Sequence, residues 1–433
     1  MIDPAPLNLH IERHQLANGL RVVLHQDRRL PLVAVNLWYH VGSKNELPGR
    51  TGFAHLFEHL LFQGSAHVGT NDHFKLVQQA GGVANGSTWY DRTNYYETLP
   101  SHQLDLGLWL ESDRMGHFLP AITSEKLENQ RQVVMNERRQ RVDNQPYGSA
   151  IETLYHLLFP EGHPYRWPVI GYMEDIEAAT LDMVQGFFET YYTPSNAVLT
   201  LAGDFEQDDA LERVQRYFGD IPPGGPIERP RIEPVTLEGE RRRVLEDQVN
   251  LPRLYMAFHA PPYGDDAWYA ADLLARVLTS GRSSVLYDDL VVERRLAQDL
   301  GAYILPTESS SIFCLIASAK PGSDPDELDR ALCSHLQSTA DTLITDEALE
   351  RARNSLLTES YHDLQSLADR ADQISQFATY FDAPEKGMRE IERYRALEAP
   401  DLRDFARRFL RLDRRALVTV LPASGGGAET AAT

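Results

Sequence analysis

TGFAHLFEHLLF, at residues 51–62, is the stretch from which the fold and the chemistry of this chain follow most directly. Its apolar residues recur at intervals of three and four, a spacing typical of an amphipathic helix. On such a helix His55 and His59 lie one turn apart on the same face, with Glu58 close to them. Two imidazoles at this spacing can hold one metal ion, and the carboxylate can take a proton from a nearby water. The stretch therefore predicts a helix that carries a metal site.

A core-facing helix with two incidental histidines is the alternative interpretation of the same stretch. Phe53, Phe57 and Leu60 border the polar positions. Burying two imidazoles and a carboxylate among them would leave polar groups without partners, which costs free energy. We therefore favour the metal site.

A further metal ligand must come from another part of the chain, because a catalytic zinc site normally takes three protein ligands and leaves one position for water. Residues 124–142 predict a helix with an apolar side, and Glu137 on this helix is the best candidate. Glu125 and Glu128 compete for the role, since most glutamates on helices are solvated. His163, in Gly-His-Pro-Tyr, is expected to be a turn or packing residue rather than a ligand.

Strands and helices are mixed on both sides of this stretch. Asn18-Gly19, between two β-type runs, predicts a hairpin at residues 16–26. Further strands are expected at residues 31–41, 89–99 and 196–202, and further helices at residues 72–80, 101–115 and 124–142. This order favours an α+β fold over a doubly wound parallel sheet.

A segment rich in proline and glycine, residues 219–240, divides the chain nearly in half and excludes regular structure. The second half then repeats a strand, helix and strand order at residues 253–259, 266–278 and 312–319, which indicates a duplicated α+β unit. We predict two similar α+β domains, each an antiparallel-rich sheet packed by helices, joined by this linker. Their boundaries are expected at residues 1–218 and 241–423, with a flexible tail at 424–433.

The composition excludes several classes of protein. The 433 residues carry 42 basic and 63 acidic side chains, a net charge of −21, which is the wrong sign for binding nucleic acid. Such acidity can steer cationic substrates, but it also serves ordinary solubility. No stretch approaches the roughly 18 apolar residues of a membrane span, so no membrane partner is expected.

Two cysteines and the amino terminus bear on the compartment. Cys314 and Cys333 form neither a disulfide framework nor a cysteine-ligated metal site, and we expect both to be buried small apolar residues. The amino terminus lacks the apolar run of a signal peptide. We therefore expect a cytoplasmic protein, or a periplasmic one if a leader has been removed.

These residues together resemble the pitrilysin/insulinase family of zinc peptidases, in the short branch that includes mitochondrial processing peptidase. His-x-x-Glu-His is the inverzincin signature. The similarity extends over residues 16–24, 81–100, 132–140, 162–178 and 191–205. The resemblance implies one Zn²⁺ per chain held by His55, His59 and Glu137, with Glu58 as the general base.

The resemblance also implies an edge strand that binds the backbone of a peptide substrate. The matching residues are Ala84, Asn85, Gly86, Ser87 and Thr88. From residue types alone, Asn85 and Gly86 equally describe a turn. Gln130 stands where some family members carry an additional glutamate, so that carboxylate is absent here.

Residues 283–298 (SSVLYDDLVVERRLAQ) depart from the family pattern, in which an Arg and a Tyr seven residues apart assist catalysis. Val291 stands at the Arg position and Gln298 at the Tyr position. Arg294 and Arg295 lie nearby, and a helical shift of three or four residues would partly compensate, but a solvated face is the favoured interpretation.

We therefore expect a zinc metalloendopeptidase subunit that cleaves peptides or unfolded segments. A homologous partner subunit without zinc, forming a heterodimer, is expected to supply the missing Arg and Tyr. A homodimer that is active alone and a non-catalytic processing or scaffold subunit are the alternatives.

Overall fold

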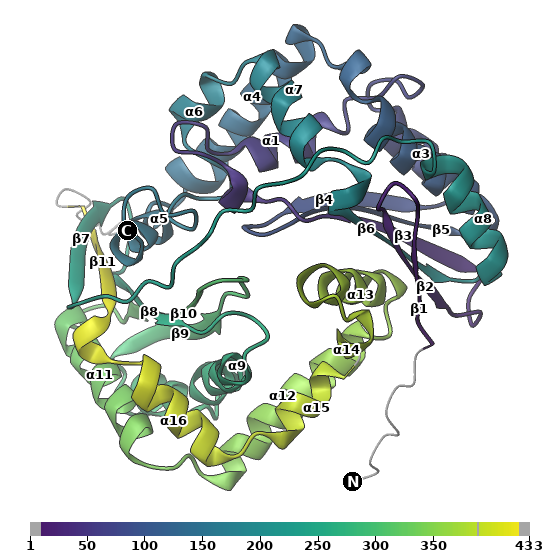
Figure 1. The fold of residues 1–433 in the computed structure, drawn as a ribbon. Helices are drawn as coiled ribbons and strands as arrows, with labels where there is room; N and C mark the ends of the chain where they lie inside the picture. Colours follow the sequence, from purple (N-terminus) through teal and green to yellow (C-terminus); the bar gives the residue numbers. More distant parts are fainter. Residues whose placement is uncertain (1–9, 388, 424–433) are drawn as a thin grey trace, which may run out of the picture. The chain divides into compact units, whose positions relative to one another are not determined.

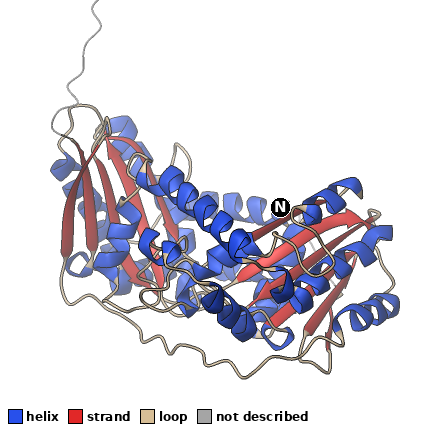
Figure 2. Ribbon diagram, turned by 90° about the horizontal axis from the view of Figure 1, so that it is seen from above, coloured by secondary structure: helices blue, strands red, loops and turns tan. Residues whose placement is uncertain are grey.

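The computed structural model describes residues 10–387 and 389–423, so the predicted tail at 424–433 lies outside the described residues. The chain forms two compact units, each with a β-sheet packed by helices, which confirms the predicted fold class (Figures 1 and 2). Of the described residues, unit 1 comprises 10–138, Trp167–Arg231, 360–387 and 389–390, and unit 2 comprises Arg139–Arg166, Ile232–Glu359 and 391–423.

The sheet of unit 1 has six strands in the order β1-β2-β6-β3-β5-β4. Its strands are β1 (Glu12–Gln15), β2 (Arg21–Gln26), β3 (Leu32–Tyr39), β4 (Val83–Thr88), β5 (Thr93–Pro100) and β6 (Ala197–Gly203). The predicted hairpin is present as β1 and β2, with Gly19 in the left-handed region at φ +88°. Among the described strands of this sheet only β2 and β6 run parallel, and β4 lies at the outer edge.

Helices cover both faces of this sheet. Those of unit 1 are α1 (Phe53–Leu60), α2 (Asp72–Gln79), α3 (Leu104–His117), α4 (Ser124–Arg138), α6 (Met173–Glu177), α7 (Leu181–Tyr191), α8 (Gln207–Phe218), α13 (Leu367–Phe381) and α14 (Pro384–Gly387). Short helices are η1 (Ser43–Asn45), η2 (Ser101–Gln103), η3 (Leu119–Ala121) and η5 (Pro194–Asn196). Figure 1 shows α1 and α3 on one face of the strands and α13 on the other.

The sheet of unit 2 has five strands in the order β7-β11-β8-β10-β9. They are β7 (Arg241–Asp247), β8 (Arg253–Ala260), β9 (Ala297–Ile304), β10 (Ser311–Ala319) and β11 (Ala416–Pro422). The helices are α5 (Ala150–Leu158), α9 (Asp266–Thr279), α10 (Val285–Tyr287), α11 (Pro325–Asp341), α12 (Asp346–Asp363), α15 (Glu390–Ala396) and α16 (Ala399–Phe409). Shorter turns of helix are η4 (Arg139–Asp143), η6 (Asp288–Glu293) and η7 (Leu412–Arg414).

The compact units differ from the predicted domain boundaries, which ran continuously over residues 1–218 and 241–423. The helix α5, from the first half of the sequence, packs on the sheet of unit 2, and α13, from the second half, packs on the sheet of unit 1. No helix or strand occurs in the predicted linker at residues 219–240.

Small residues and polar contacts explain why α13 belongs to unit 1. Ala371 packs against Ala34 and Ala202, so that the helix approaches the sheet closely. The Ser375 hydroxyl donates to Thr200 Oγ1 at 2.7 Å. Contacts this distant in sequence leave no local pattern, and the boundary prediction therefore missed them.

Among the described residues, no helix combines the length and the apolar character needed to cross a membrane.

Candidate metal centre

The helix α1 begins at a buried carboxylate. Glu46 Oε2 accepts a hydrogen bond from Gly52 N at 2.9 Å, and Glu46 Oε1 accepts one from Ala54 N at 2.8 Å. A carboxylate in this position satisfies donors that a helix leaves open at its amino end. Glu46 was not among the residues expected to shape the site, although an acidic residue shortly before a predicted helix is a usable signal.

The apolar side of α1 fixes the direction in which its polar residues point. Phe57 is fully buried, and its ring stacks on Phe187 and Tyr192 with centroids 5.2 and 5.0 Å apart. The Tyr95 hydroxyl donates to the Phe57 carbonyl at 3.1 Å. With this side packed into the core, His55, Glu58 and His59 are only partly buried.

His55, His59 and Glu137 come together as a group of three potential metal ligands. Glu137 Oε2 lies 3.8 Å from His55 Nε2 and 3.3 Å from His59 Nε2. Bonds of about 2 Å in a tetrahedral zinc site place neighbouring ligand atoms roughly 3.3 Å apart. The three donors therefore fit a single ion without rearrangement of the helices that carry them.

The helix α4 delivers Glu137 and excludes its two competitors from the group. Arg138 Nη1 donates to the Gly171 carbonyl at 2.7 Å, which anchors the end of α4 beside Glu137. Glu125 and Glu128 are exposed, and Glu128 accepts a hydrogen bond from the Gln132 side chain at 2.9 Å. Gln130 is buried and donates to the neighbouring Asn129 side chain.

Glu58 lies on the same helix as the paired histidines and next to the edge strand β4. A Cβ on Gly86 would be only 3.3 Å from Glu58 Cγ, so the absence of a side chain there leaves room for the glutamate. Burial raises the pKa of Glu58, and a hydrogen bond with the Thr88 side chain opposes this effect only in part. A raised pKa suits a carboxylate that must take up a proton near neutral pH.

The residues Ala84, Asn85, Gly86, Ser87 and Thr88 lie in β4, and so form a strand rather than a turn. β4 pairs with β5 on one side, and it is the last strand of the sheet among the described residues. Because side chains alternate along a strand, Ala84, Gly86 and Thr88 face α1, whereas Asn85 and Ser87 face α13.

Val291 and Gln298, which stand at the family's Arg and Tyr positions, lie in a helix and in the following strand. Val291 lies in η6, and Gln298 is exposed in β9. Arg294 follows the helix and pairs with Asp289 at 3.6 Å. Arg295 has a left-handed backbone at φ +54°, so the chain has left the helix there and the suggested helical shift does not apply to it.

Three other residues singled out from the sequence take structural positions. His163 is buried, stacks on Phe159 with centroids 4.4 Å apart, and burial lowers its pKa to about 4. Cys314 is buried, as expected. Cys333 is only half-buried, and its Sγ accepts a hydrogen bond from Arg415 at 2.9 Å.

A second group of potential ligands in unit 1, which the sequence analysis missed, consists of His73, Glu97 and Glu111. All three are buried, and Arg114 forms an ion pair with Glu111. The guanidinium already supplies positive charge at this position, so the group does not require a metal ion.

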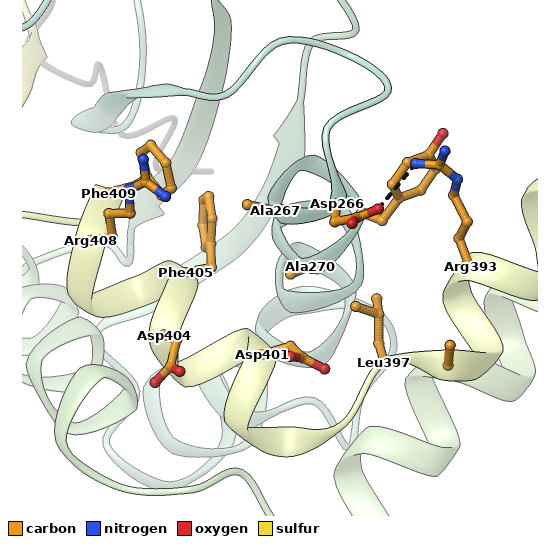
Figure 3. A pocket seen from close by; sticks show the side chains of 12 residues that line it. Asp266, Ala267, Ala270, Arg393, Leu397, Asp401, Asp404, Phe405, Arg408 and Phe409 are labelled. Carbon is orange, nitrogen blue, oxygen red and sulfur yellow. Dashed lines mark hydrogen bonds and ion pairs between the residues drawn. The ribbon is translucent and has the colours of Figure 1, made fainter.

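Unit 2 contains a pocket of a different kind, with a volume of about 450 Å³, among α9, α15 and α16 (Figure 3). Phe405, Leu397 and Ala270 supply much of its apolar lining. Arg393 and Asp266 at its edge pair with each other at 3.2 Å. Among the described residues, neither group of potential metal ligands lies in this unit.

Two family models match successive parts of the chain. A family model described as "Insulinase (Peptidase family M16)" matches residues 21–163, and one described as "Peptidase M16 inactive domain" matches residues 178–356. The first match contains His55, Glu58, His59 and Glu137, and the second contains Val291 and Gln298.

Individual relatives cover most of the chain. It is 29% identical to the zinc protease PqqE of Helicobacter pylori, over 89% of this chain and 87% of that protein. It is 23% identical to a probable mitochondrial-processing peptidase subunit beta of Arabidopsis thaliana, over 84% of this chain and 70% of that protein. The crystal structure of a protease from Helicobacter pylori matches with a TM-score of 0.89 at 27% identity, covering 96% of this chain and all of that one.

Proposed function

This chain belongs to the insulinase family, peptidase family M16, and from that premise we propose that it is a zinc-dependent endopeptidase acting on peptides or unfolded segments. The observation that carries the proposal is the convergence of His55, His59 and Glu137 beside Glu58. Two imidazoles and a carboxylate are the ligand types of hydrolytic zinc sites. The names of several relatives, which include "zinc protease", support the same choice of metal.

Each group in the site has a distinct task in this proposal. Zinc, when bound by His55, His59 and Glu137, would polarise the scissile carbonyl and lower the pKa of the attacking water. Glu58 takes the proton of that water and passes it to the leaving amine. The outer edge of β4 binds the substrate backbone as an added strand, which holds the scissile bond beside Glu58.

The test measures zinc and turnover on the same preparations. Wild-type protein should bind one zinc per chain and cleave a quenched peptide, and removal of zinc by a chelator should stop cleavage until zinc is restored. His55→Ala should lose both properties. His102→Ala is the matched control, because His102 is exposed and lies outside the group. Full turnover by zinc-free His55→Ala would refute the proposal.

A partner subunit is the second part of the proposal. Val291 and Gln298 cannot supply the charge and the hydroxyl expected of an Arg and a Tyr, so oxyanion support must come from another chain. The word "subunit" in the name of the Arabidopsis relative supports this direction. We expect a heterodimer with a homologous chain that lacks His-x-x-Glu-His and carries both residues.

The requirement for a partner subunit is tested by mixing this chain with the homologous chain. Turnover per zinc-loaded chain should rise when that homologous chain is added, and the rise should saturate at one partner per chain. If the chain alone turns over the peptide as fast as any mixture, it acts as a monomer or homodimer instead.

A wholly non-catalytic chain is less well supported. The description "inactive domain" applies to residues 178–356. The ligand group and Glu58 lie outside that match, in residues 21–163.

A further inference from the structure

The loop that joins α1 to α2, residues 61–71, is tied to the carboxyl-terminal end of α3. Ala66 N donates to the His117 carbonyl at 2.9 Å, which places the loop backbone directly beside the last residue of α3. Asp113 lies one helical turn before His117. Its carboxylate accepts hydrogen bonds from the Ser65 hydroxyl and, at 3.2 Å, from His67 N. These contacts fix the position of the loop relative to α3.

Two exposed imidazoles meet where this loop contacts α3. The rings of His67 and His117 have centroids 5.5 Å apart and an angle of 88° between their planes. The proposed zinc ligands His55 and His59 are arranged similarly, with centroids 4.9 Å apart and an angle of 72°. Bonds of about 2 Å place an ion roughly 3.2 Å from each ring centre, so two rings that share an ion lie about 5–6 Å apart. The separation of His67 and His117 therefore allows one ion to bind both.

Asp113 prepares His67 to act as a ligand. Its Oδ1 lies 2.5 Å from His67 Nδ1. An ionised carboxylate can only accept a hydrogen bond, so Nδ1 carries the hydrogen and Nε2 of the neutral ring presents a lone pair. Histidines that bind metals almost always donate their other ring N–H to a carboxylate, a carbonyl or a water. The side chain of His67 is 63% exposed and that of Asp113 only 2%, so a buried carboxylate orients a ring that an ion in solution can reach.

The charge at this position also favours a cation. Asp113 is buried, and the Ser65 hydroxyl and the His67 backbone are neutral donors. Across residues 10–387 and 389–423, His67 is the only basic side chain within ion-pair distance of Asp113, and its ring is charged only when protonated. The neighbouring Arg114 pairs with Glu111 instead. An ion bound to the ring would therefore compensate a buried negative charge that the protein leaves without a permanent cation.

We propose that His67 and His117 form a surface metal site, which takes one divalent transition-metal ion of the kind that imidazoles prefer, such as Zn²⁺. Water completes the coordination. Two protein ligands hold an ion less tightly than His55, His59 and Glu137 do, so the tightly bound zinc of the proposed function remains one per chain. The role of the second ion is structural, because it links the loop between α1 and α2 to the end of α3.

Zinc binding beyond the first equivalent tests the surface metal site. Zinc-loaded protein is dialysed against rising concentrations of free Zn²⁺, and the bound metal per chain is measured. We expect a second equivalent in wild type and a loss of affinity of about tenfold or more in His67→Ala and in His117→Ala, because each variant keeps only one imidazole. His102→Ala, an exposed histidine outside the pair, is the matched control and should keep the second equivalent.

Hydrogen exchange locates the second ion. Additional Zn²⁺ should slow the exchange of backbone amides in residues 61–71 of zinc-loaded wild-type protein, because the ion joins this loop to α3. The same addition should not slow them in His117→Ala, which lacks only an exposed ring and keeps the backbone contacts of the loop. Mg²⁺ at the same concentration should have no effect, since it prefers oxygen ligands.

A second equivalent that is absent from wild type, or that persists unweakened in both His67→Ala and His117→Ala, overturns the surface metal site. Slowing of exchange by Mg²⁺ as strong as that by Zn²⁺ also overturns it, because this would indicate a general attraction of cations to the net charge of −21. An unchanged exchange rate in wild type overturns the link between the loop and α3.

The proposed function is tested separately from this site. All the outcomes above concern zinc beyond the first equivalent, so they leave the zinc held by His55, His59 and Glu137 unaffected. If His117→Ala loses the second equivalent but zinc-loaded wild-type protein cleaves no peptide, alone or with its partner, the proposed function fails and the surface metal site stands.

Discussion

Apart from the additional strand β1 in unit 1, the two sheets of this protein have the same construction. In unit 1 the order β2-β6-β3-β5-β4 corresponds strand by strand to β7-β11-β8-β10-β9 in unit 2. The first pair is parallel in both sheets, and the other pairs are antiparallel. Each sheet also receives a helix from the other half of the sequence, α13 in unit 1 and α5 in unit 2.

The chemistry of the two units is nevertheless different. The helix that follows the middle strand is α1 in unit 1, with His55, Glu58 and His59, whereas α9 in unit 2 buries Trp268, Leu273 and Leu274 at the same stage of the fold. The shared arrangement of strands and helices therefore does not by itself produce a metal site. The site depends on a few side chains that unit 1 places on this arrangement.

Glu58→Gln is the substitution expected to reduce activity most. It would leave unit 1 without its general base, so that neither unit could carry out the reaction. The amide keeps the shape of the carboxylate but cannot take up the proton of the attacking water. We expect kcat to fall by a factor of about 10²–10⁴. Zinc content should stay at one per chain, because Glu58 is not in the ligand group.

The matched control is Glu125→Gln, an exposed glutamate on α4, which should retain wild-type kcat. Kinetics on a quenched peptide and metal analysis of the same samples separate the roles. A Glu58→Gln protein with both zinc and full activity would show that another group is the base.

Each unit buries an ion pair between an arginine and a carboxylate, Arg114–Glu111 in unit 1 and Arg415–Asp329 in unit 2, and unit 2 offers the sharper test. Arg415 Nη1 donates to Asp329 Oδ1 at 2.6 Å, and both residues are buried. In Asp329→Asn the buried guanidinium of Arg415 loses part of the negative charge that compensates its positive charge. We expect unit 2 to lose about 3 kcal/mol of its free energy of unfolding.

The pH dependence of this loss has a definite sign. Burial would raise the pKa of Asp329, but hydrogen bonds and the charges of Arg415 and Arg242 outweigh it, so the pKa is lowered overall. The stabilisation is therefore complete above the unfolded-state pKa of about 3.9 and is lost as pH falls through the lower folded-state value. The free energy of unfolding measured in urea should be higher for wild type than for Asp329→Asn at pH 7. The difference should be much smaller at pH 2.

Asp341→Asn, an exposed aspartate on the same helix, is the control for this pair and should leave the urea midpoint unchanged. A difference between wild type and Asp329→Asn that is as large at pH 2 as at pH 7 would contradict the assigned ion pair.

Local patterns allowed much of unit 1 to be predicted from the sequence. Asn18-Gly19 predicts the β1–β2 hairpin because its turn favours a left-handed backbone. The spacing of His55 and His59 predicts a shared helix face for the same kind of local reason. Glu137 needed the family resemblance, because the contact of α1 with α4 has no local signature and Glu125 and Glu128 fit the helix equally well.

Long-range packing accounts for what the sequence did not reveal. The exchange of α5 and α13 depends on contacts between residues more than a hundred positions apart, such as His259 Nε2 with the Leu158 carbonyl at 3.0 Å. The hydrogen bond from Asn94 to Asp372 has no signature in the sequence for the same reason, since these residues meet only through the packing of α13.

The edge strands give the finest comparison, because each has a glycine in the middle. A Cβ on Gly86 of β4 would lie 3.2 Å from Asn94 O and 3.3 Å from Glu58 Cγ, whereas a Cβ on Gly301 of β9 would meet nothing within 4 Å. In Gly86→Ala the added methyl must displace either the strand or Glu58. We expect kcat/KM to fall about tenfold, since small misplacements of catalytic groups are costly.

Gly301→Ala makes the same chemical change on the equivalent strand and should leave kcat/KM at the wild-type value. Because neither glycine has a positive φ, both alanines fit the backbone, and any difference between them reports the surroundings of the side chain. Zinc content should be unchanged in both variants, which separates crowding of Glu58 from loss of the metal. If Gly86→Ala retains full activity, the position of Glu58 does not depend on the space beside β4. An added methyl group would then be tolerated on β4 as it is expected to be on β9 of unit 2.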